Sequence, residues 1–232
     1  MKFILLPGFD GTGILFAPLL RVLPPEIEPV VVAYPADRTC SAEELVGIVL
    51  AQLPEVEPYV LIAESFSGPI ALKAAARPQM PPAALVLCAS FVQCPLPRIL
   101  IAILRFCGKA LTWTRPPRWL VRRYLLGEAE EAVVALFYRA IGEVSSRVMA
   151  HRLSVLLEFD ERFAPPALEF PLLYLQANKD RLVRARNFEI LQRRYPGTRL
   201  EGIESPHLIL QVQPEASVRA ILQFLAWTRS GA

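Results

Sequence analysis

Histidine and cysteine are scarce in this chain of 232 residues, which contains two histidines and four cysteines. The cysteines include no pair with the CxxC spacing, so the usual ligands of a zinc site are too few, and we expect no metal centre. Reduced thiols are the simplest interpretation of these cysteines, and they are typical of a cytoplasmic protein. We therefore expect a cytoplasmic location.

An excess of one charge is also missing. The 25 Lys and Arg residues against 22 Asp and Glu residues give a formal net charge of +3. Nucleic-acid binding depends on many Lys and Arg contacts with phosphates, so we expect no nucleic-acid partner. Hydrophobic residues make up 53% of the chain, which excludes intrinsic disorder and indicates a large core. The length suits one domain with one insertion.

Long uninterrupted apolar runs are absent as well. The apolar amino-terminal segment is broken at Pro7, Gly8 and Asp10, which argues against a signal peptide. The longest uncharged stretch, residues 78–97, contains several prolines that a membrane helix tolerates poorly. The sequence therefore predicts no transmembrane span.

Short apolar runs that end in turn residues recur along the chain and predict buried parallel strands. These runs are FILL, VVVAY, YVLIAE, ALVLCAS and LLYLQA, followed by a candidate strand at 198–203. Helical patterns lie at 41–53, where SAEE places a serine cap before acidic residues, and at 69–77 and 214–227. This alternation predicts an α/β fold with a mostly parallel sheet and helices on both faces.

The alternation stops between residues 92 and 169, a stretch far longer than an ordinary connection. We predict that residues 1–91 and 170–232 form the core and that residues 92–169 form a helical lid. Within the lid, the patterns predict helices at 128–141 and 145–159.

The segment AESFSG follows a predicted strand and precedes a predicted helix, as a nucleophile elbow of the G-x-S-x-G type does. Ser65 is the predicted nucleophile, although Ala63 and Ser67 replace the two glycines of the pattern. Ser67 is a rival, but it would place Pro69 at the crowded second position after it. Taken alone, the segment is also compatible with serines that merely cap the following helix.

The order of the remaining candidates favours a catalytic triad, because hydrolases with this elbow need an acid after the nucleophile and a histidine last. Asp180 follows the strand LLYLQA, and His207 follows the last candidate strand. The other aspartates precede Ser65 or lie in the predicted lid. The histidine would take the serine proton and the aspartate would fix the histidine tautomer, so we predict the triad Ser65, Asp180 and His207.

The loop PGFDGTG follows the first predicted strand and can present backbone N–H groups to a reacting carbonyl. We predict that the N–H groups of Phe9 and Phe66 form the oxyanion hole. The loop lacks both the GK[ST] ending and the GxGxxG spacing of nucleotide-binding loops, which argues against nucleotide binding. Asp10 in this loop and His151, on the apolar face of a predicted lid helix, are candidates for lining the substrate pocket.

The segments PGFDGTG, AESFSG, NKD and SPH occur in the order typical of the α/β-hydrolase superfamily, which the chain resembles at both ends. The opening LLPGFDGTG with ESFSG is similar to a group of small bacterial α/β-hydrolases. The first loop is also similar to that of plastid phytyl ester synthases, with proline in place of the usual histidine of the HG pair. The resemblance implies a helical lid inserted after the sixth family strand, and acyl hydrolysis or transfer without a cofactor.

The predicted lid carries a run of basic residues without an acid between residues 98 and 123, interleaved with tryptophan and leucine. The basic residues are Arg98, Arg105, Lys109, Arg115, Arg118, Arg122 and Arg123. Such a surface is suited to an anionic membrane surface or to an acyl carrier protein, as in pimeloyl-carrier methyl esterases. A solvated basic face is the plainer alternative.

We therefore expect a serine hydrolase that cleaves a carboxylic ester with a hydrophobic acyl or alcohol group through an acyl-enzyme. Its partner would be a small-molecule or lipid-like ester. An acyltransferase, or a hydrolase of a carrier-bound ester or thioester, would use the same triad. A noncatalytic binding module on the same fold is the alternative from another class.

Overall fold

A computed structural model describes residues 1–77, 81–96 and 115–230. Within these residues the chain forms a six-stranded sheet in which every neighbouring pair is parallel. The strands, in the spatial order β2-β1-β3-β4-β5-β6, are β1 (Lys2–Leu6), β2 (Glu28–Val31), β3 (Tyr59–Glu64), β4 (Ala84–Cys88), β5 (Leu172–Ala177) and β6 (Arg199–Ile203). The predicted α/β fold with a parallel sheet is confirmed.

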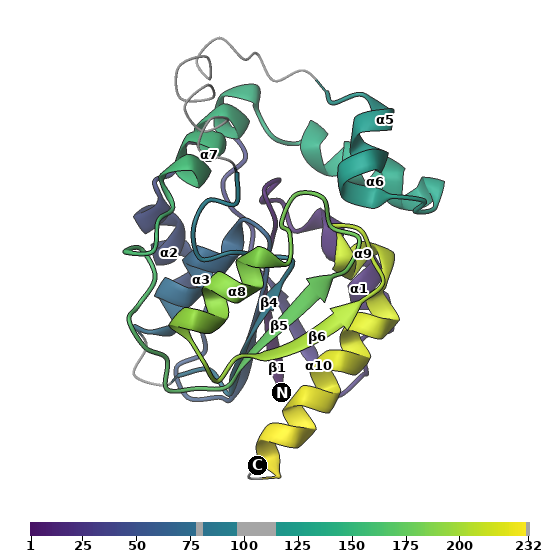
Figure 1. The fold of residues 1–232 in the computed structure, drawn as a ribbon. Coiled ribbons are helices and arrows are strands. Elements are labelled where there is room, and N and C mark those ends of the chain that lie inside the picture. The colour runs from purple at the N-terminus through teal and green to yellow at the C-terminus, as the bar shows by residue number, and fades with distance from the viewer. Residues whose placement is uncertain (78–80, 97–114, 231–232) are drawn as a thin grey trace.

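Helices cover both faces of the sheet (Figure 1). One face packs against α2 (Ala42–Leu50), α3 (Ser67–Ala75) and α8 (Arg186–Arg194), and the other packs against α1 (Ala17–Val22), α9 (Ile209–Val212) and α10 (Pro214–Arg229). Because both faces are covered, the central strands are largely apolar, and all residues of β3 and β4 are buried, whereas the edge strands β2 and β6 are more exposed. A short 3-10 turn, η1 (Ile14–Phe16), precedes α1.

The second strand differs from the prediction. The apolar run VVVAY predicted a strand at 30–34, whereas β2 covers Glu28–Val31. Beyond the strand, the Tyr34 backbone N–H donates to the Gly11 carbonyl at 2.7 Å, so the chain turns toward the loop that follows β1. Val32 and Tyr34 at the end of this run are buried, whereas Ala33 is exposed.

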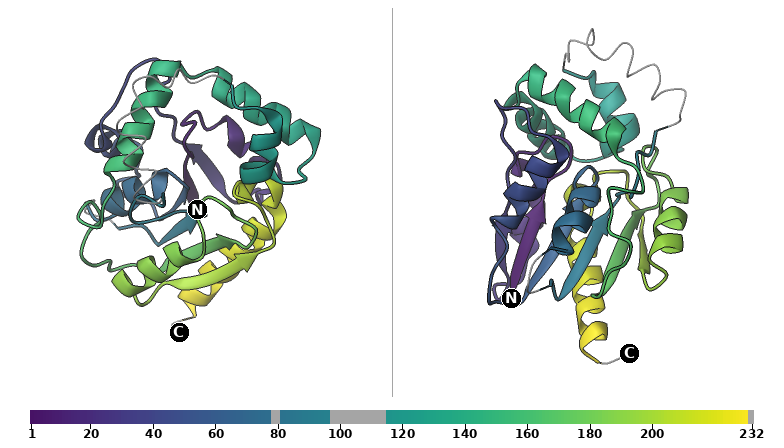
Figure 2. Two further views of the ribbon diagram at one scale, coloured as in Figure 1. Left: turned by 45° about the horizontal axis from the view of Figure 1, so that its top comes forward. Right: turned by 90° about the vertical axis from the view of Figure 1, so that its left-hand side faces the viewer.

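Among the residues that the structure describes, four helical segments lie between β4 and β5: α5 (Arg118–Val121), η2 (Arg122–Leu126), α6 (Glu131–Gly142) and α7 (Ser146–Glu158). They lie beyond the carboxyl ends of the strands, at the top of Figure 1, and both views of Figure 2 keep them on that side. Leu15 and Leu208 of the core share an apolar cluster with Val134 and Phe137 of α6, so α6 rests on the core.

We call α5, η2, α6 and α7 the lid helices, and the lid boundary at residues 92–169 stays a prediction. Residues 98–114 of the predicted basic run lie outside the described residues. In the part of the chain that the structure describes, no helix combines the length and apolar character needed to cross a bilayer.

The order of the strands also places a crevice. The adjacent strands β1 and β3 are followed in the chain by β2 on one side and β4 on the other, so the connections after them run in opposite directions. In open α/β sheets, ligands bind outside the carboxyl ends of the strands at such a point. The loop after β1 and the turn after β3 meet here, and these are the two segments that carry the predicted oxyanion donors and nucleophile.

Candidate active site

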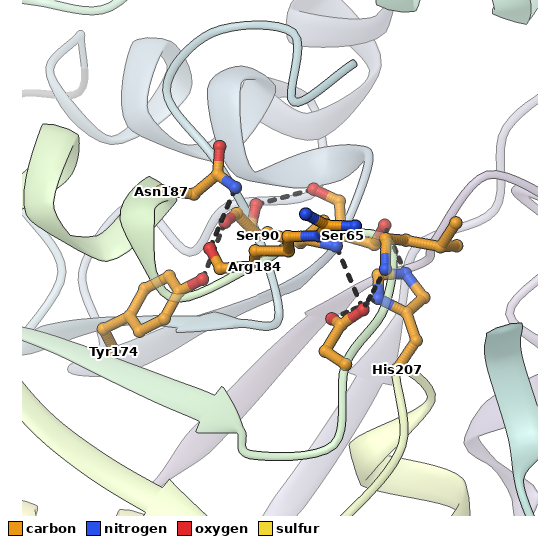
Figure 3. A network of polar contacts seen from close by, with 9 residues as sticks. Ser65, Ser90, Tyr174, Arg184, Asn187 and His207 are labelled. Carbon is orange, nitrogen blue, oxygen red and sulfur yellow. Dashed lines mark hydrogen bonds and ion pairs between the residues drawn. The ribbon is translucent and has the colours of Figure 1, made fainter. Parts of the chain in front are cut away.

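Ser65 lies in a strained turn at the carboxyl end of β3. Its φ angle is +48°, a left-handed conformation that a non-glycine residue rarely adopts. Its backbone N–H donates to the Cys88 carbonyl at 2.9 Å, and its carbonyl accepts a hydrogen bond from Ser90 Oγ at 2.6 Å. Both contacts are with residues at or beyond the end of β4, so the neighbouring strand holds the serine in this turn (Figure 3).

A close approach behind the turn requires Gly68. A Cβ atom added at Gly68 would lie 1.8 Å from Ser90 Oγ and 2.9 Å from Ser90 Cβ, distances that no side chain can adopt. The glycine therefore allows α3 to start directly after the turn while Ser90 bonds to the Ser65 carbonyl. This position, rather than the residues two before and two after Ser65, is where the turn depends on glycine.

The structure brings Ser65, His207 and Asp180 together. His207 Nε2 lies 2.9 Å from Ser65 Oγ, and His207 Nδ1 lies 2.6 Å from Asp180 Oδ2. A carboxylate oxygen only accepts, so Nδ1 carries the proton in neutral His207 and Nε2 is left to accept the serine proton. The three side chains come from loops after β3, β5 and β6, which meet at one edge of the sheet.

Asp180 is fixed by its own loop. Its second carboxylate oxygen, Oδ1, accepts the backbone N–H groups of Leu182 at 2.7 Å and Val183 at 3.0 Å. The Asp180 side chain is 1% exposed, so these bonds replace the water that the carboxylate loses. The orientation of the carboxylate toward His207 is therefore set before any ligand binds.

The pKa of His207 lies above its usual value. Burial alone would lower this pKa, but the charge of Asp180 and the hydrogen bond with it outweigh that effect, and the charge of Glu64 adds to them. A more basic imidazole removes a serine proton more readily once it is in its neutral form.

The two residues that carry the predicted oxyanion donors are in contact through their side chains. Phe66 directly follows Ser65, and the Phe9 ring packs edge to face on the Phe66 ring with centroids 5.7 Å apart. The Gly8 carbonyl accepts the Gly11 N–H at 3.0 Å, which closes the loop after β1 into a tight turn. The use of these two N–H groups as an oxyanion hole stays a prediction.

Two other predicted candidates have different surroundings. Asp10 is 5% exposed, and its Oδ2 accepts the backbone N–H of Thr12 at 2.9 Å and the Thr12 hydroxyl at 2.6 Å, so this carboxylate braces its own loop. His151 is half-buried on α7. A role for either residue in lining a substrate pocket stays a prediction.

The Ser67 hydroxyl is occupied by buried hydrogen bonds within the core. Ser67 is fully buried, and its hydroxyl donates to the Pro7 carbonyl and lies 2.7 Å from the Tyr34 hydroxyl. The hydroxyl that faces His207 is that of Ser65, which agrees with the preference for Ser65 over Ser67.

Sequence reasoning missed two buried charged residues near the site. Glu64 is 1% exposed, and its Oε2 accepts Gln211 Nε2 at 3.1 Å. Burial and the nearby Asp10 raise the Glu64 pKa to about 7, although His207 and Gln211 oppose the rise. Position 64 is the variable residue of the elbow pattern, so the pattern carries no signal for it.

The second missed residue is Arg152 on α7, which is 3% exposed. It donates hydrogen bonds to the carbonyls of Phe9 and Asp10 in the loop after β1 and to that of Pro35. A weak signal was available, because Arg152 lies four residues after Val148 and three before Val155 on the buried stripe of its helix. His151 fits the same stripe, and arginine is rarely buried, so the sequence favoured the histidine.

A family model described as serine aminopeptidase, S33, matches residues 40–208. No curated protein matches the chain by sequence.

Several solved structures have a similar fold. An esterase (EaEST) from Exiguobacterium antarcticum is 18% identical with a TM-score of 0.80, covering 97% of this chain and 92% of its own. A thermophilic esterase from Thermogutta terrifontis is 18% identical with a TM-score of 0.81, covering 98% and 90%. The enol-lactonase from Burkholderia xenovorans LB400 is 16% identical with a TM-score of 0.78, covering 97% and 91%. At these identities the likeness shows the fold alone.

Proposed function

The chain belongs to the α/β-hydrolase family described as serine aminopeptidase, S33. From this premise we propose that the protein is a serine hydrolase that cleaves a carboxylic ester through an acyl-enzyme. The observation that carries the proposal is the hydrogen-bonded series from Ser65 Oγ through His207 to Asp180. The left-handed φ of Ser65 supports it, because that strain aims the hydroxyl out of the sheet.

In the proposed reaction Ser65 Oγ attacks the ester carbonyl carbon while His207 Nε2 takes the hydroxyl proton. The charge that develops on the carbonyl oxygen meets the N–H groups of Phe9 and Phe66. When the C–O bond breaks, His207 returns the proton to the departing alkoxide, which leaves as the alcohol. Water then attacks the acyl-enzyme with His207 again as the base, and this step releases the acid and regenerates Ser65.

Aromatic side chains near the serine support a hydrophobic substrate. Phe66 packs against Phe9 and Phe159, each with centroids 5.7 Å away. Phe9 is partly exposed, while Phe66 and Phe159 are buried behind it. A ring that is rigidly backed and partly open offers an apolar acyl or alcohol group a surface next to the reacting carbonyl.

The test is labelling with a fluorophosphonate, followed by intact-mass analysis and peptide mapping. We expect one adduct on Ser65, no adduct in Ser65→Ala, and a strongly reduced labelling rate in His207→Ala. Ser67→Ala is the matched control and keeps a Ser65 adduct. Ester turnover in Ser65→Ala and His207→Ala should each fall by roughly four to six orders of magnitude. Folded wild-type protein without an adduct would instead favour the noncatalytic binding module.

A cleft beside the triad favours a second candidate, the hydrolysis or transfer of an acyl group attached to an acidic carrier. The cleft has a volume of about 610 Å³ and lies between the lid helices and the loops that hold Asp180 and His207. Four basic residues line it, Arg122, Arg123, Lys179 and Arg181, against the acids Glu128 and Glu204. Arg123 and Arg181 are exposed and form no ion pair among the described residues, so they can receive an anionic partner.

The carrier candidate is tested with the double variant Arg123→Glu, Arg181→Glu. We expect it to lower turnover of an acyl-carrier substrate while a short soluble ester is cleaved at the wild-type rate, with exposed Arg139→Glu on α6 as the control. If the double variant loses binding to anionic vesicles as much as it loses carrier turnover, the cleft would instead contact a membrane surface. Unchanged turnover of the carrier substrate and unchanged vesicle binding would leave the soluble ester as the proposed substrate.

A further inference from the structure

Arg152 is a buried cation that bonds to backbone rather than to a carboxylate. Among the described residues it forms no ion pair; its guanidinium donates to Phe9 O at 3.2 Å, to Asp10 O, and to Pro35 O at 2.9 Å. The charge is thus solvated by three carbonyl dipoles. Arg152 in turn supplies each of these carbonyls with a donor, and pairing of buried carbonyls stabilises the conformation of the loop.

The loop after β1 is shaped around this guanidinium. Gly11 has a φ of +71°, and a Cβ atom there would lie 2.5 Å from Arg152 Nη1. On its other side the Gly11 carbonyl accepts the Tyr34 N–H at 2.7 Å. The loop is therefore held between Arg152 and the chain that follows β2.

The same contacts fix the peptide plane that carries the Phe9 N–H. In a trans peptide the carbonyl of Gly8 and the N–H of Phe9 point in opposite directions within one plane. The Gly8 carbonyl is held by the Gly11 N–H at 3.0 Å, and the next carbonyl along the chain, that of Phe9, is held by Arg152. With the carbonyls on both sides of Phe9 bonded, the direction of its N–H is set.

We propose that Arg152 is a positioning residue, which holds the loop after β1 in the conformation that aims the Phe9 N–H at the reacting oxygen. This inference rests on the proposed function. Because Arg152 belongs to α7, the oxyanion hole is complete only while that lid helix is docked. Arginine suits the role because its planar fork reaches several carbonyls at once, which a lysine ammonium does not.

The variants Arg152→Ala and Arg152→Lys test the proposal, with Arg147→Met on the exposed side of α7 as the matched control. We expect kcat for a short soluble ester to fall by about a hundredfold in Arg152→Ala, as for a small misplacement of a catalytic group, with KM nearly unchanged. Arg152→Lys should keep most of this defect, whereas Arg147→Met should match the wild type.

Two further readouts separate positioning from a general loss of structure. Added guanidinium, at a concentration that leaves the fold intact, should restore part of the kcat of Arg152→Ala and none of that of Ser65→Ala. Amide hydrogen exchange should become faster at residues 8–11 in Arg152→Ala while exchange in β3 and β4 is unchanged. The exchange readout requires no catalytic activity.

Failure of the inference is distinguishable from failure of the proposed function. A wild-type protein inert toward fluorophosphonate and esters would overturn the function. If the wild type is active, either of two results would overturn the role of Arg152. One is a folded Arg152→Lys variant with the wild-type kcat, and the other is an Arg152→Ala variant that loses activity through KM alone. If Arg152→Ala does not fold, Arg152→Lys carries the test alone.

Discussion

Two ionisable side chains flank Ser65 and influence each other. The pKa of His207 is raised, in part by the charge of Glu64, and the pKa of Glu64 is raised to about 7 by burial and by Asp10. Glu64 therefore changes charge within the physiological range. The proposed reaction needs neutral His207 as its base. Lowering the pH should therefore abolish activity by protonating His207.

We predict that kcat/KM falls as the pH falls through the pKa of His207, which lies above 6.5. In Glu64→Gln the negative charge beside His207 is removed, so the imidazole is easier to deprotonate and the acidic limb should move to lower pH. A pH series of ester hydrolysis for both proteins checks this. An acidic limb at the same pH, or one shifted to higher pH, would contradict the coupling.

The same carboxyl affects stability with a definite sign. The folded-state pKa of Glu64 is raised from 4.5 to about 7, so the folded protein binds this proton more tightly than the unfolded chain does. The resulting stabilisation is fully present below pH 4.5 and is lost as the pH rises through about 7. It is absent from Glu64→Gln, which serves as the comparison in urea unfolding at several pH values.

At the scale of single elements, the helix α2 shows how closely local sequence can define a boundary. Ser41 accepts the Glu44 N–H at 3.3 Å, and the Glu44 carboxylate accepts the Ser41 N–H at 2.8 Å, which is a complete capping box. Both partners lie within four residues, so no tertiary contact is needed to form it.

We predict that Ser41→Ala lowers the free energy of unfolding by about 1 kcal/mol, because it leaves N–H groups of the first turn without an acceptor. The matched control is Ser154→Ala in the interior of α7, where alanine is the better helix former and the change should be within about 0.5 kcal/mol. Chemical denaturation measures both. Equal effects of the two variants would contradict a specific role of the cap.

The helix α7 shows the limit of local sequence. Its ends were predicted within a residue or two, since Ser145 caps it and the helix covers Ser146–Glu158. The side chain that points inward could not be predicted in the same way. His151 lies three residues after Val148 and four before Val155, and Arg152 lies four after and three before, which are equivalent positions on a helix. Three carbonyls from distant loops make burial of Arg152 favourable, and no local pattern contains them.

At the scale of the molecule, the lid helices and the core sheet are held by apolar clusters of different size. The sheet lies between two large clusters, whereas α6 shares a smaller one with η1 and Leu208. Regions with less buried apolar surface open at lower free energy than the core.

We therefore predict that native-state amide exchange is faster in α5 and α6 than in β1, β3 and β4. If these helices open as a unit, the opening free energies of their amides should respond alike to mild denaturant. Exchange of α6 at the rate of the central strands would show that the lid helices and the core unfold together. The measurement uses the full chain and needs no ligand.

The sequence by itself determined the parallel sheet and the main helices, and it singled out Ser65, Asp180 and His207 as the predicted triad, because apolar runs, turn residues and chain order are local or ordinal properties. The tertiary structure decided what depends on distance between remote segments. Only the folded chain places His207 Nε2 2.9 Å from Ser65 Oγ, makes Gly68 the indispensable glycine of the turn, and buries Arg152 against the loop after β1. Burial of a charge is favourable only when distant partners converge on it, and that convergence is a property of the fold.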